Sequence, residues 1–312
     1  MQLGKNERDY FLKKYNLTDD DIEVNLDSDI IKLFIEGKNL EMIPDDLACL
    51  KKITRLHLQY NFIREITNLE NLTELKHLHL YRNRIKKITN LEKLERLVEL
   101  VLSYNEIAQI SGLENLLTLE DLILKFNKIG KIENLNILCK LKSLFLRGNR
   151  ISKIEGLDSL KNLKYLDLSG NRIEKIEGLD GLENLKSLGL TNNKITKIEG
   201  LETLKSLETV YLSHNQIEEL EYFDYLPNLQ EVHLNGNPIN IKHQFERIEL
   251  DRFKKYKNFK KLVLTYPSGS LPSPTWSYYK FLIFVDKTGQ ELTPMRVFEI
   301  IEWWKKGHDY FS

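Results

Sequence analysis

The hydrophobic positions of this chain recur with a period of 22 residues. The segment Leu141–Asn162, LKSLFLRGNRISKIEGLDSLKN, is one full period, with apolar residues three, five and eight positions before Asn149 and two, five, eight and eleven after it. Nine asparagines stand at the same interval, from Asn61 to Asn237. A fixed period of this length is typical of solenoids, in which each repeat buries its apolar side chains against its neighbours. The pattern predicts a solenoid of about ten copies over residues 31–239.

Each repeat is expected to contribute one short strand to a parallel sheet. The residues five and three positions before each asparagine are leucine or valine, so they point into the core while the residues between them point outward. The nine inward pairs are Leu56/Leu58, Leu78/Leu80, Leu100/Leu102, Leu122/Leu124, Leu144/Leu146, Leu166/Leu168, Leu188/Leu190, Val210/Leu212 and Val232/Leu234. The asparagine amide both donates and accepts, so we assign it a structural role in pairing buried backbone groups of the turn.

A second column lies seven residues after each asparagine and contains only Asn and Gly before Tyr222. Its members are Asn68, Asn90, Gly112, Asn134, Gly156, Gly178 and Gly200. This choice of residues predicts a left-handed backbone at every one of these positions. In the first, atypical copy the hydrophobic positions align only if Lys38, not Asn39, takes the asparagine position. That copy is then one residue longer, with the extra residue near Pro44.

The two ends of the chain differ from the repeats. Residues 1–30 are expected to form a helical cap, with a helix over Asn6–Tyr15 and a turn or short helix at Asp19–Asp21. Residues 240–312 are expected to form a small α+β domain that packs on the last repeat. Its predicted elements are a helix over Gln244–Tyr256, strands over Lys261–Tyr266 and Tyr278–Val285, and a helix over Thr293–Lys306. Trp303 and Trp304 on that last helix offer an alternative docking surface.

Composition excludes several classes of function. The chain has 312 residues, with 46 basic and 46 acidic side chains, so its overall charge favours neither nucleic acid nor an acidic partner. The two cysteines, Cys49 and Cys139, are four repeats apart and cannot meet in a solenoid. The first residues contain no apolar run of the kind found in signal peptides, and no stretch approaches the length of a transmembrane span. We therefore expect a cytoplasmic, monomeric protein with no membrane association.

The outward strand positions carry the candidate binding residues, because the repeat does not dictate their identity. Aromatic, basic and apolar side chains gather there in the first half of the solenoid, which is the composition of a protein-binding surface. The predicted contact residues are Arg55, His57, Tyr60, His77, His79, Tyr81, Arg82, Val101, Tyr104, Ile123, Lys125, Phe126, Phe145, Arg147, Tyr165 and Tyr211. The basic residues favour a partner with an acidic contact surface. Alternatively, the rings stack only to stabilise the sheet.

Other chemistries have weaker support in the sequence. There is no phosphate-binding glycine loop and no hydrolase or metalloprotease motif, so no enzymatic activity and no cofactor are predicted. His57, His77 and His79 are close enough in the predicted sheet to suggest a zinc site as a minor alternative. The aromatic and basic residues could also stack the bases of a single-stranded nucleic acid, but Glu99, Asp121, Asp167 and Glu231 on the same face argue against it.

The repeat L-x-x-L-x-L-x-x-N-x-I-x-x-I-x-x-L-x-x-L resembles the short 22-residue subclass of leucine-rich repeats, over about Ile31–Pro238. That subclass is typified by a regulatory subunit of protein phosphatase 1, and bacterial internalins look similar. The resemblance implies an α/β horseshoe with a parallel sheet on its concave side. It also implies an intracellular adaptor that binds a partner protein on that side. In the phosphatase-binding version, the partner would be a catalytic subunit.

Overall fold

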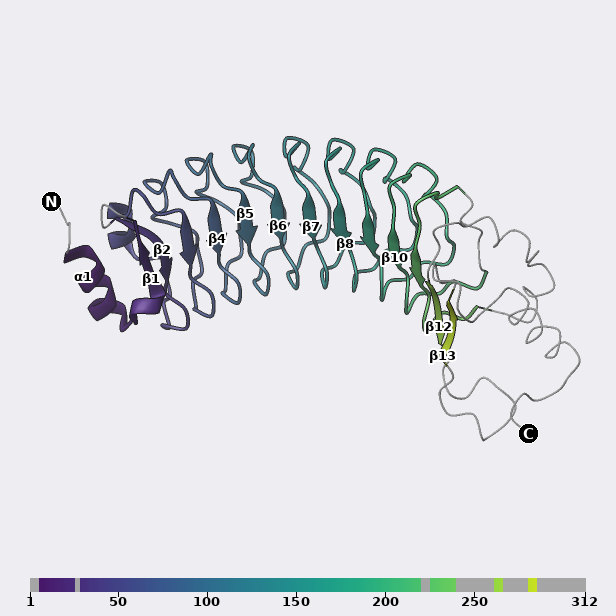
Figure 1. Cartoon of the computed structure of the whole chain (residues 1–312), viewed down its shortest axis with the longest axis horizontal. Helices are drawn as coiled ribbons and strands as arrows, with labels where there is room; N and C mark the ends of the chain where they lie inside the picture. The colour runs from purple at the N-terminus through teal and green to yellow at the C-terminus, as the bar shows by residue number, and fades with distance from the viewer. Residues whose placement is uncertain (1–5, 26–28, 220–224, 240–260, 266–279, 285–312) are drawn as a thin grey trace, which may run out of the picture.

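A computed structural model describes residues 6–25, 29–219, 225–239, 261–265 and 280–284 of the chain (Figure 1). The turns stack in chain order into an arc, as the 22-residue period predicts. The helical elements are α1 (Asn6–Tyr15), η1 (Asp19–Asp21) and η2 (Asp45–Cys49). The strands are β1 (Ile22–Val24), β2 (Ile30–Phe34), β3 (Arg55–His57), β4 (His77–His79), β5 (Glu99–Val101), β6 (Asp121–Ile123), β7 (Ser143–Phe145), β8 (Tyr165–Asp167), β9 (Ser187–Gly189), β10 (Thr209–Tyr211), β11 (Glu231–His233), β12 (Lys261–Thr265) and β13 (Lys280–Phe284).

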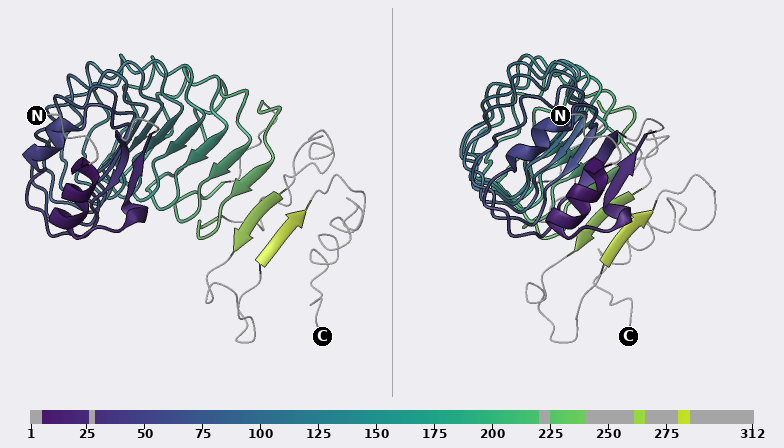
Figure 2. Two further views of the ribbon diagram at one scale, coloured as in Figure 1. Left: turned by 60° about the vertical axis from the view of Figure 1, so that its left-hand side comes forward. Right: turned by 90° about the vertical axis from the view of Figure 1, so that its left-hand side faces the viewer.

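The strands form a single sheet in chain order, which confirms the predicted parallel solenoid. Neighbours from β2 to β12 are parallel, and from β3 to β11 the paired residues are 22 positions apart, such as Leu56 with Leu78. At the two ends the direction reverses, because β1 is antiparallel to β2 and β13 is antiparallel to β12. Seen along the row of turns, the strands lie on one side of the coil (Figure 2). The antiparallel strand β1 was not predicted from the sequence.

The apolar positions of the repeat form one continuous core that runs from Phe11 to Ile239. The inward pair of each strand is buried, as the alternation predicts; Leu100 and Leu102, for example, have no exposed surface. The isoleucines and leucines after each asparagine are buried as well. Each turn therefore contributes its apolar side chains to a core shared with the turns before and after it, and the stack holds together by these shared contacts.

The asparagines form the predicted hydrogen-bonded ladder, and eight of the nine are buried. The Asn105 amide nitrogen donates to the carbonyl of Leu80 in the preceding turn, at 2.9 Å, and to that of Leu102 in its own turn, at 3.1 Å. Its Oδ1 accepts the Ile85 N–H at 2.9 Å. The Leu80 carbonyl also accepts from Asn83, at 3.1 Å. Since consecutive asparagines share one carbonyl, the ladder is continuous from turn to turn.

The column of Asn and Gly residues seven positions after the ladder is left-handed, as predicted. Its φ angles lie between 58° and 69°, for example 60° at Asn90 and 69° at Gly112. The three asparagines of this column, Asn68, Asn90 and Asn134, also donate to a backbone carbonyl of the preceding turn, as Asn90 does to Ile66 at 2.6 Å. Tyr222, where the sequence leaves the column, lies outside the described residues.

The first repeat has the expected register. The backbone N–H groups of Lys38 and Leu40 donate to Oδ1 of Asn61, so Leu40 corresponds to the isoleucine two positions after a ladder asparagine. Ile43 is buried in register, whereas the next buried leucine is Leu47, one position late. The extra residue therefore lies between Ile43 and Leu47, next to Pro44, as predicted.

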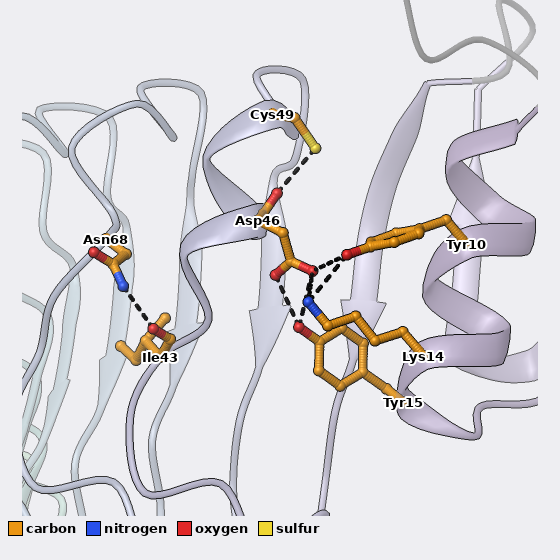
Figure 3. A network of polar contacts seen from close by, with 7 residues as sticks. All are labelled: Tyr10, Lys14, Tyr15, Ile43, Asp46, Cys49 and Asn68. Atoms are coloured by element: carbon orange, nitrogen blue, oxygen red, sulfur yellow. Dashed lines mark hydrogen bonds and ion pairs between the residues drawn. The ribbon is translucent and has the colours of Figure 1, made fainter. Parts of the chain in front are cut away.

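This extra residue brings Asp46 to the N-terminal helix α1 (Figure 3). The Asp46 carboxylate accepts hydrogen bonds from the hydroxyl of Tyr10 at 3.0 Å, the ammonium of Lys14 at 2.6 Å and the hydroxyl of Tyr15 at 2.8 Å. Burial would raise the pKa of Asp46, but these three donors outweigh it and lower the pKa below its usual value. Phe11 of the same helix is fully buried in the solenoid core. The helix therefore caps the first turn through both apolar and polar contacts.

At the other end, β12 and β13 correspond to the two strands predicted for residues 240–312. They extend the sheet of the solenoid, with Leu262 paired to Val232 of β11. The predicted helices at Gln244–Tyr256 and Thr293–Lys306, and with them Trp303 and Trp304, lie outside the described residues. The division of the chain at residues 30 and 239 remains a prediction.

Candidate functional site

All of the contact residues predicted from the sequence lie outside the apolar core. Each is half-buried or exposed, and none belongs to the buried cluster that runs through the solenoid. They occupy the outward positions of β3 to β8 and of β10, and the turns that directly follow the strands. The structure brings most of them together into two rows that cross the strands.

The first of these, which we call the rim row, consists of Tyr60, Tyr81, Tyr104 and Phe126, in the turns that follow β3 to β6. Their rings contact one another in sequence. Successive ring centroids are 5.3 Å apart for Tyr60 and Tyr81, 5.2 Å for Tyr81 and Tyr104, and 4.4 Å for Tyr104 and Phe126. Tyr60 is 51% exposed and Phe126 is 38% exposed. The row is thus an open aromatic strip across four neighbouring turns.

Arg82 lies over the middle of the rim row. Its guanidinium carbon is 5.6 Å from the ring centres of Tyr60 and Tyr81 and 5.0 Å from that of Tyr104. Its Nε donates to the Tyr81 hydroxyl at 3.0 Å. These cation–π contacts hold the guanidinium on the aromatic strip. The side chain remains exposed to solvent and can still bind an anion.

Three of the four rim-row residues, all except Tyr81, have a left-handed backbone, which the sequence did not lead us to predict. The residue directly before each ladder asparagine has a positive φ, including 57° at Tyr60, 53° at Arg82, 55° at Tyr104 and 54° at Phe126. Glycine adopts this conformation freely, whereas a bulky residue does so at an energetic cost. Bulky side chains in such a conformation are found where a function needs them.

Glycines occupy the same left-handed position on both sides of the rim row. Gly37 precedes it, and Gly148 and Gly170 follow it. A Cβ atom on Gly148 would lie 2.4 Å from Cδ1 of Phe126, so the Phe126 ring rests against the glycine backbone of the next turn. The aromatic strip therefore has a defined beginning and end.

The second row, which we call the inner row, consists of the last residues of the strands. Its members are Phe34, His57, His79, Val101, Ile123 and Phe145, paired in register from β2 to β7. The rings of Phe34 and His57 are stacked with centroids 4.2 Å apart, and those of His57 and His79 are 4.3 Å apart. The Lys125 ammonium lies 4.4 Å from the Phe145 ring centre. Phe34 was not among the predicted contact residues. In the register of the first repeat it lies beside His57.

Two histidines of β4, His77 and the inner-row His79, contact a carboxylate. Nδ1 of His77 and Nε2 of His79 lie 2.9 Å and 3.2 Å from Oε2 of Glu99. Burial would raise the pKa of Glu99, but these contacts outweigh it and lower the pKa. Burial, together with His79, lowers the pKa of His57 to about 4, so His57 is neutral at pH 7. Among the residues that the structure describes, no three His, Cys, Asp or Glu side chains are arranged to hold a metal ion.

The basic residues of this surface have no acidic partner in the described part of the chain. Arg55, Arg82, Lys125 and Arg147 take part in none of the ion pairs found there. By contrast, Lys142 in the turn before β7 pairs with Glu120 at 2.6 Å. The first half of the sheet face therefore carries four basic side chains without an ion-pair partner among the described residues, alongside the acidic Glu99 and Asp121.

The second half of the sheet face is different. Tyr165 and Tyr211 are exposed, but neither makes a ring contact with the rim row or the inner row. Tyr211 stacks instead on His233 of β11, with centroids 4.7 Å apart. Between them the inner positions become Asp167 and Gly189. The predicted set of contact residues thus divides into a contiguous cluster from β3 to β7 and two separate tyrosines.

The structure also bears on the other sequence-based expectations. Cys49 and Cys139 form no disulfide with each other, as their separation predicts. Within the described residues, no helix has the length and apolar character needed to cross a bilayer.

Comparisons with known proteins agree with this architecture. A family model described as "Leucine-rich repeat" matches residues 139–266, and one described as "Leucine Rich repeats (2 copies)" matches residues 51–93 and 73–115. A search of curated proteins finds no match.

Among solved structures, a leucine-rich-repeat protein of Leptospira interrogans, LIC12759, is 32% identical, with a TM-score of 0.65. The match covers 72% of this chain and 58% of that protein. The internalin InlF of Listeria monocytogenes is 21% identical, with a TM-score of 0.62 and coverage of 83% and 88%, and supports the fold alone. TLR13, in a complex with the RNA ssRNA13, is 26% identical with a TM-score of 0.58, and the match covers 69% of this chain and 37% of TLR13.

Proposed function

The chain is a leucine-rich-repeat protein, and we propose that it is a non-enzymatic scaffold that binds a partner protein on the first half of its concave sheet face, from β3 to β7. The leucine-rich-repeat fold is a common protein-interaction scaffold. The observation that carries the proposal is the rim row, in which three tyrosines and a phenylalanine form an open strip around Arg82. Exposed aromatic and arginine side chains of this kind dominate the binding energy of protein interfaces.

The charge of the face supports an acidic partner. Arg55, Arg82, Lys125 and Arg147 have no carboxylate partner among the described residues, so a negative surface could approach without breaking an existing ion pair. Electrostatic complementarity of this type increases the rate of association and selects the partner. The phosphatase catalytic subunit implied by the 22-residue repeat is one candidate, and an intracellular location belongs to the same proposal.

The alternative that the rings only stabilise the sheet has a weakness. Rings that serve the sheet alone would be expected at positions with ordinary backbone angles, where stacking carries no conformational cost. Instead, Tyr60, Tyr104 and Phe126 hold a left-handed conformation. A binding role explains why bulky side chains stand in four consecutive turns at a position where four of the six other described turns have glycine.

Affinity capture from native lysate tests the proposal, with wild type beside a Tyr81→Ala/Tyr104→Ala/Phe126→Ala variant. These side chains lie outside the core, so the variant is expected to stay folded. Each hot-spot residue contributes about 2 kcal/mol or more, so the variant should bind at least about 100-fold more weakly. A Leu117→Ala/Ile137→Ala variant is the matched control, because it removes exposed apolar side chains outside the two rows.

Three outcomes separate the alternatives. Loss of a protein by the triple variant but not by the control supports the proposal. Equal recovery by all three proteins refutes the concave-face site and directs attention to Trp303 and Trp304. If the bound material disappears after nuclease treatment and its affinity falls steeply as the salt concentration rises, the partner is a single-stranded nucleic acid rather than a protein.

A further inference from the structure

The sheet face offers no unpaired strand to an incoming peptide. From β3 to β11 every strand is hydrogen-bonded to a neighbour on both sides, and the sheet has its ends at β1 and β13. An extended peptide binds a sheet by pairing with an edge strand, and on the face it would leave its own backbone groups without partners. A helix satisfies its backbone hydrogen bonds internally. The occupant that suits this face is therefore helical.

The spacing of the rim row also fits a helix. Its ring centroids follow one another at 4.4–5.3 Å along the row of turns. A helix laid along the row presents side chains on one face once per turn, every ~5.4 Å. An extended chain presents them on one face every second residue, about 6.6 Å apart, and falls out of step within a few rings. Each helical turn of the occupant can thus contact one gap between rings.

The length of the occupant follows from the glycines that bound the row. Rings or Arg82 stand in four consecutive turns, between Gly37 and Gly148. Three steps between strands span about 14 Å, which corresponds to about ten residues of helix but about four residues of extended chain. The number of occupant residues that span the row therefore distinguishes a helix from an extended chain.

The charge of the row selects the side chains of the occupant. Arg82 lies at the centre of the row, in contact with three tyrosine rings, and has no acidic partner in the described part of the chain. An approaching carboxylate would form a charge-assisted hydrogen bond with its exposed guanidinium. Lys125, in the turn after β6, adds a second cation near the Phe126 end of the row.

We propose that the rim row binds an amphipathic helix of about three turns, with an apolar face on Tyr60, Tyr81, Tyr104 and Phe126 and an acidic side chain on Arg82. This inference rests on the proposed function and adds to it the conformation, length and charge of the bound segment.

Peptide display tests the inference with defined probes. Two libraries of equal length and diversity are selected on the full-length protein. One is held helical by an Ala/Glu/Lys-rich framework, and the other is held extended by flanking prolines. Soluble Tyr81→Ala/Tyr104→Ala/Phe126→Ala variant is present as a competitor to remove peptides that bind elsewhere. We expect enrichment of the helical library alone, with apolar residues at helical spacing and at least one Glu or Asp.

Charge reversal tests the contact with Arg82. The Arg82→Glu variant should bind the selected peptide at least about tenfold more weakly, and replacing the acidic peptide residue by Lys should restore affinity. Arg84→Glu is the matched control, because Arg84 is a cation two residues away that lies over Phe62, outside the rim row. Its reversal should leave the affinity within about twofold.

Photo-crosslinking measures the span of the bound peptide. With p-benzoylphenylalanine in place of Tyr60 or of Phe126, the two crosslinked peptide positions should be about nine or ten residues apart. A separation of about four residues, or enrichment of the extended library, would overturn the helix and leave the binding face in place. Failure of both libraries, or peptides that bind the triple variant equally well, would count against the helix and the proposed face together.

Discussion

Replacement of Asn105 by alanine should destabilise the solenoid more than a typical surface mutation, because the side chain serves two turns at once. It is 7% exposed and donates to the carbonyls of Leu80 and Leu102, while its Oδ1 accepts the Ile85 N–H. Alanine removes all of these bonds.

The magnitude depends on which backbone groups keep a partner. The Leu80 carbonyl still accepts from Asn83, and the Leu102 carbonyl from Asn127, so each loses one of two hydrogen bonds. Each lost bond of this kind costs about 0.5–1.5 kcal/mol. The buried Ile85 N–H loses its acceptor altogether, at about 1–3 kcal/mol. The expected loss in the free energy of unfolding is therefore about 2–6 kcal/mol.

Urea denaturation followed by circular dichroism measures this loss, with Asn115→Ala as the matched control. Asn115 is exposed and donates one hydrogen bond, to the Glu92 carbonyl at 3.1 Å. Its replacement should cost less than about 1 kcal/mol. Because repeat arrays can unfold in parts, hydrogen exchange at the Ile85 amide should be followed as well, and its protection should fall in Asn105→Ala.

A double substitution makes the test sharper. In Asn83→Ala/Asn105→Ala the Leu80 carbonyl loses both of its donors, so the double variant should lose about 1 kcal/mol more than the two single variants added together. If Asn105→Ala costs no more than Asn115→Ala, or the two substitutions are additive, the shared-carbonyl ladder does not stabilise the solenoid as argued.

Two further predictions concern the backbone and the N-terminal cap. Gly112→Ala should destabilise the protein by more than about 2 kcal/mol, because φ is 69° and the added Cβ would lie 2.2 Å from the Ile88 carbonyl oxygen. Gly130→Ala is the control, because a Cβ there would meet open space, and it should leave the free energy of unfolding unchanged in the same urea titration. Asp46→Ala should cost about 2 kcal/mol and expose α1 to limited proteolysis. Because the pKa of Asp46 is lowered in the folded state, its carboxylate stabilises the protein above about pH 4, and this stabilisation is lost as the pH falls further. The free energy of unfolding of the wild type should therefore approach that of the variant in acid. An unchanged difference between the two down to pH 2 would contradict this.

The scaffold could be predicted from the sequence because its chemistry repeats. Nine asparagines and their flanking leucines specify the strand, the inward positions and the hydrogen-bonded turn, and the structure confirms all three. The first repeat could be predicted as well, since Leu40 and Ile43 align only with Lys38 at the ladder position. In each case the same pattern of buried apolar residues recurs from repeat to repeat along the chain.

The geometry of the proposed binding face could be predicted only in part. The sequence placed the aromatic residues on the outward face of the sheet. It did not show that Tyr81, which stands one position earlier in its repeat than Tyr60 and Tyr104, would join a row with them. This arrangement depends on side-chain directions in a left-handed turn, which the repeat pattern does not specify. The signal was present nonetheless, because Gly37, Gly148, Gly170 and Gly236 occupy the same column.

That column also bears on the proposed function. A repeat protein gains stability when every turn uses the residue that its backbone prefers, and here the preferred residue before each ladder asparagine is glycine. Four consecutive turns depart from this preference, and their side chains are three aromatic rings and Arg82. Asn192 and His214 also stand in this column, so the position tolerates residues other than glycine. The run of four turns from Tyr60 to Phe126 differs because its side chains contact one another on an open face, which supports the proposed partner-binding surface.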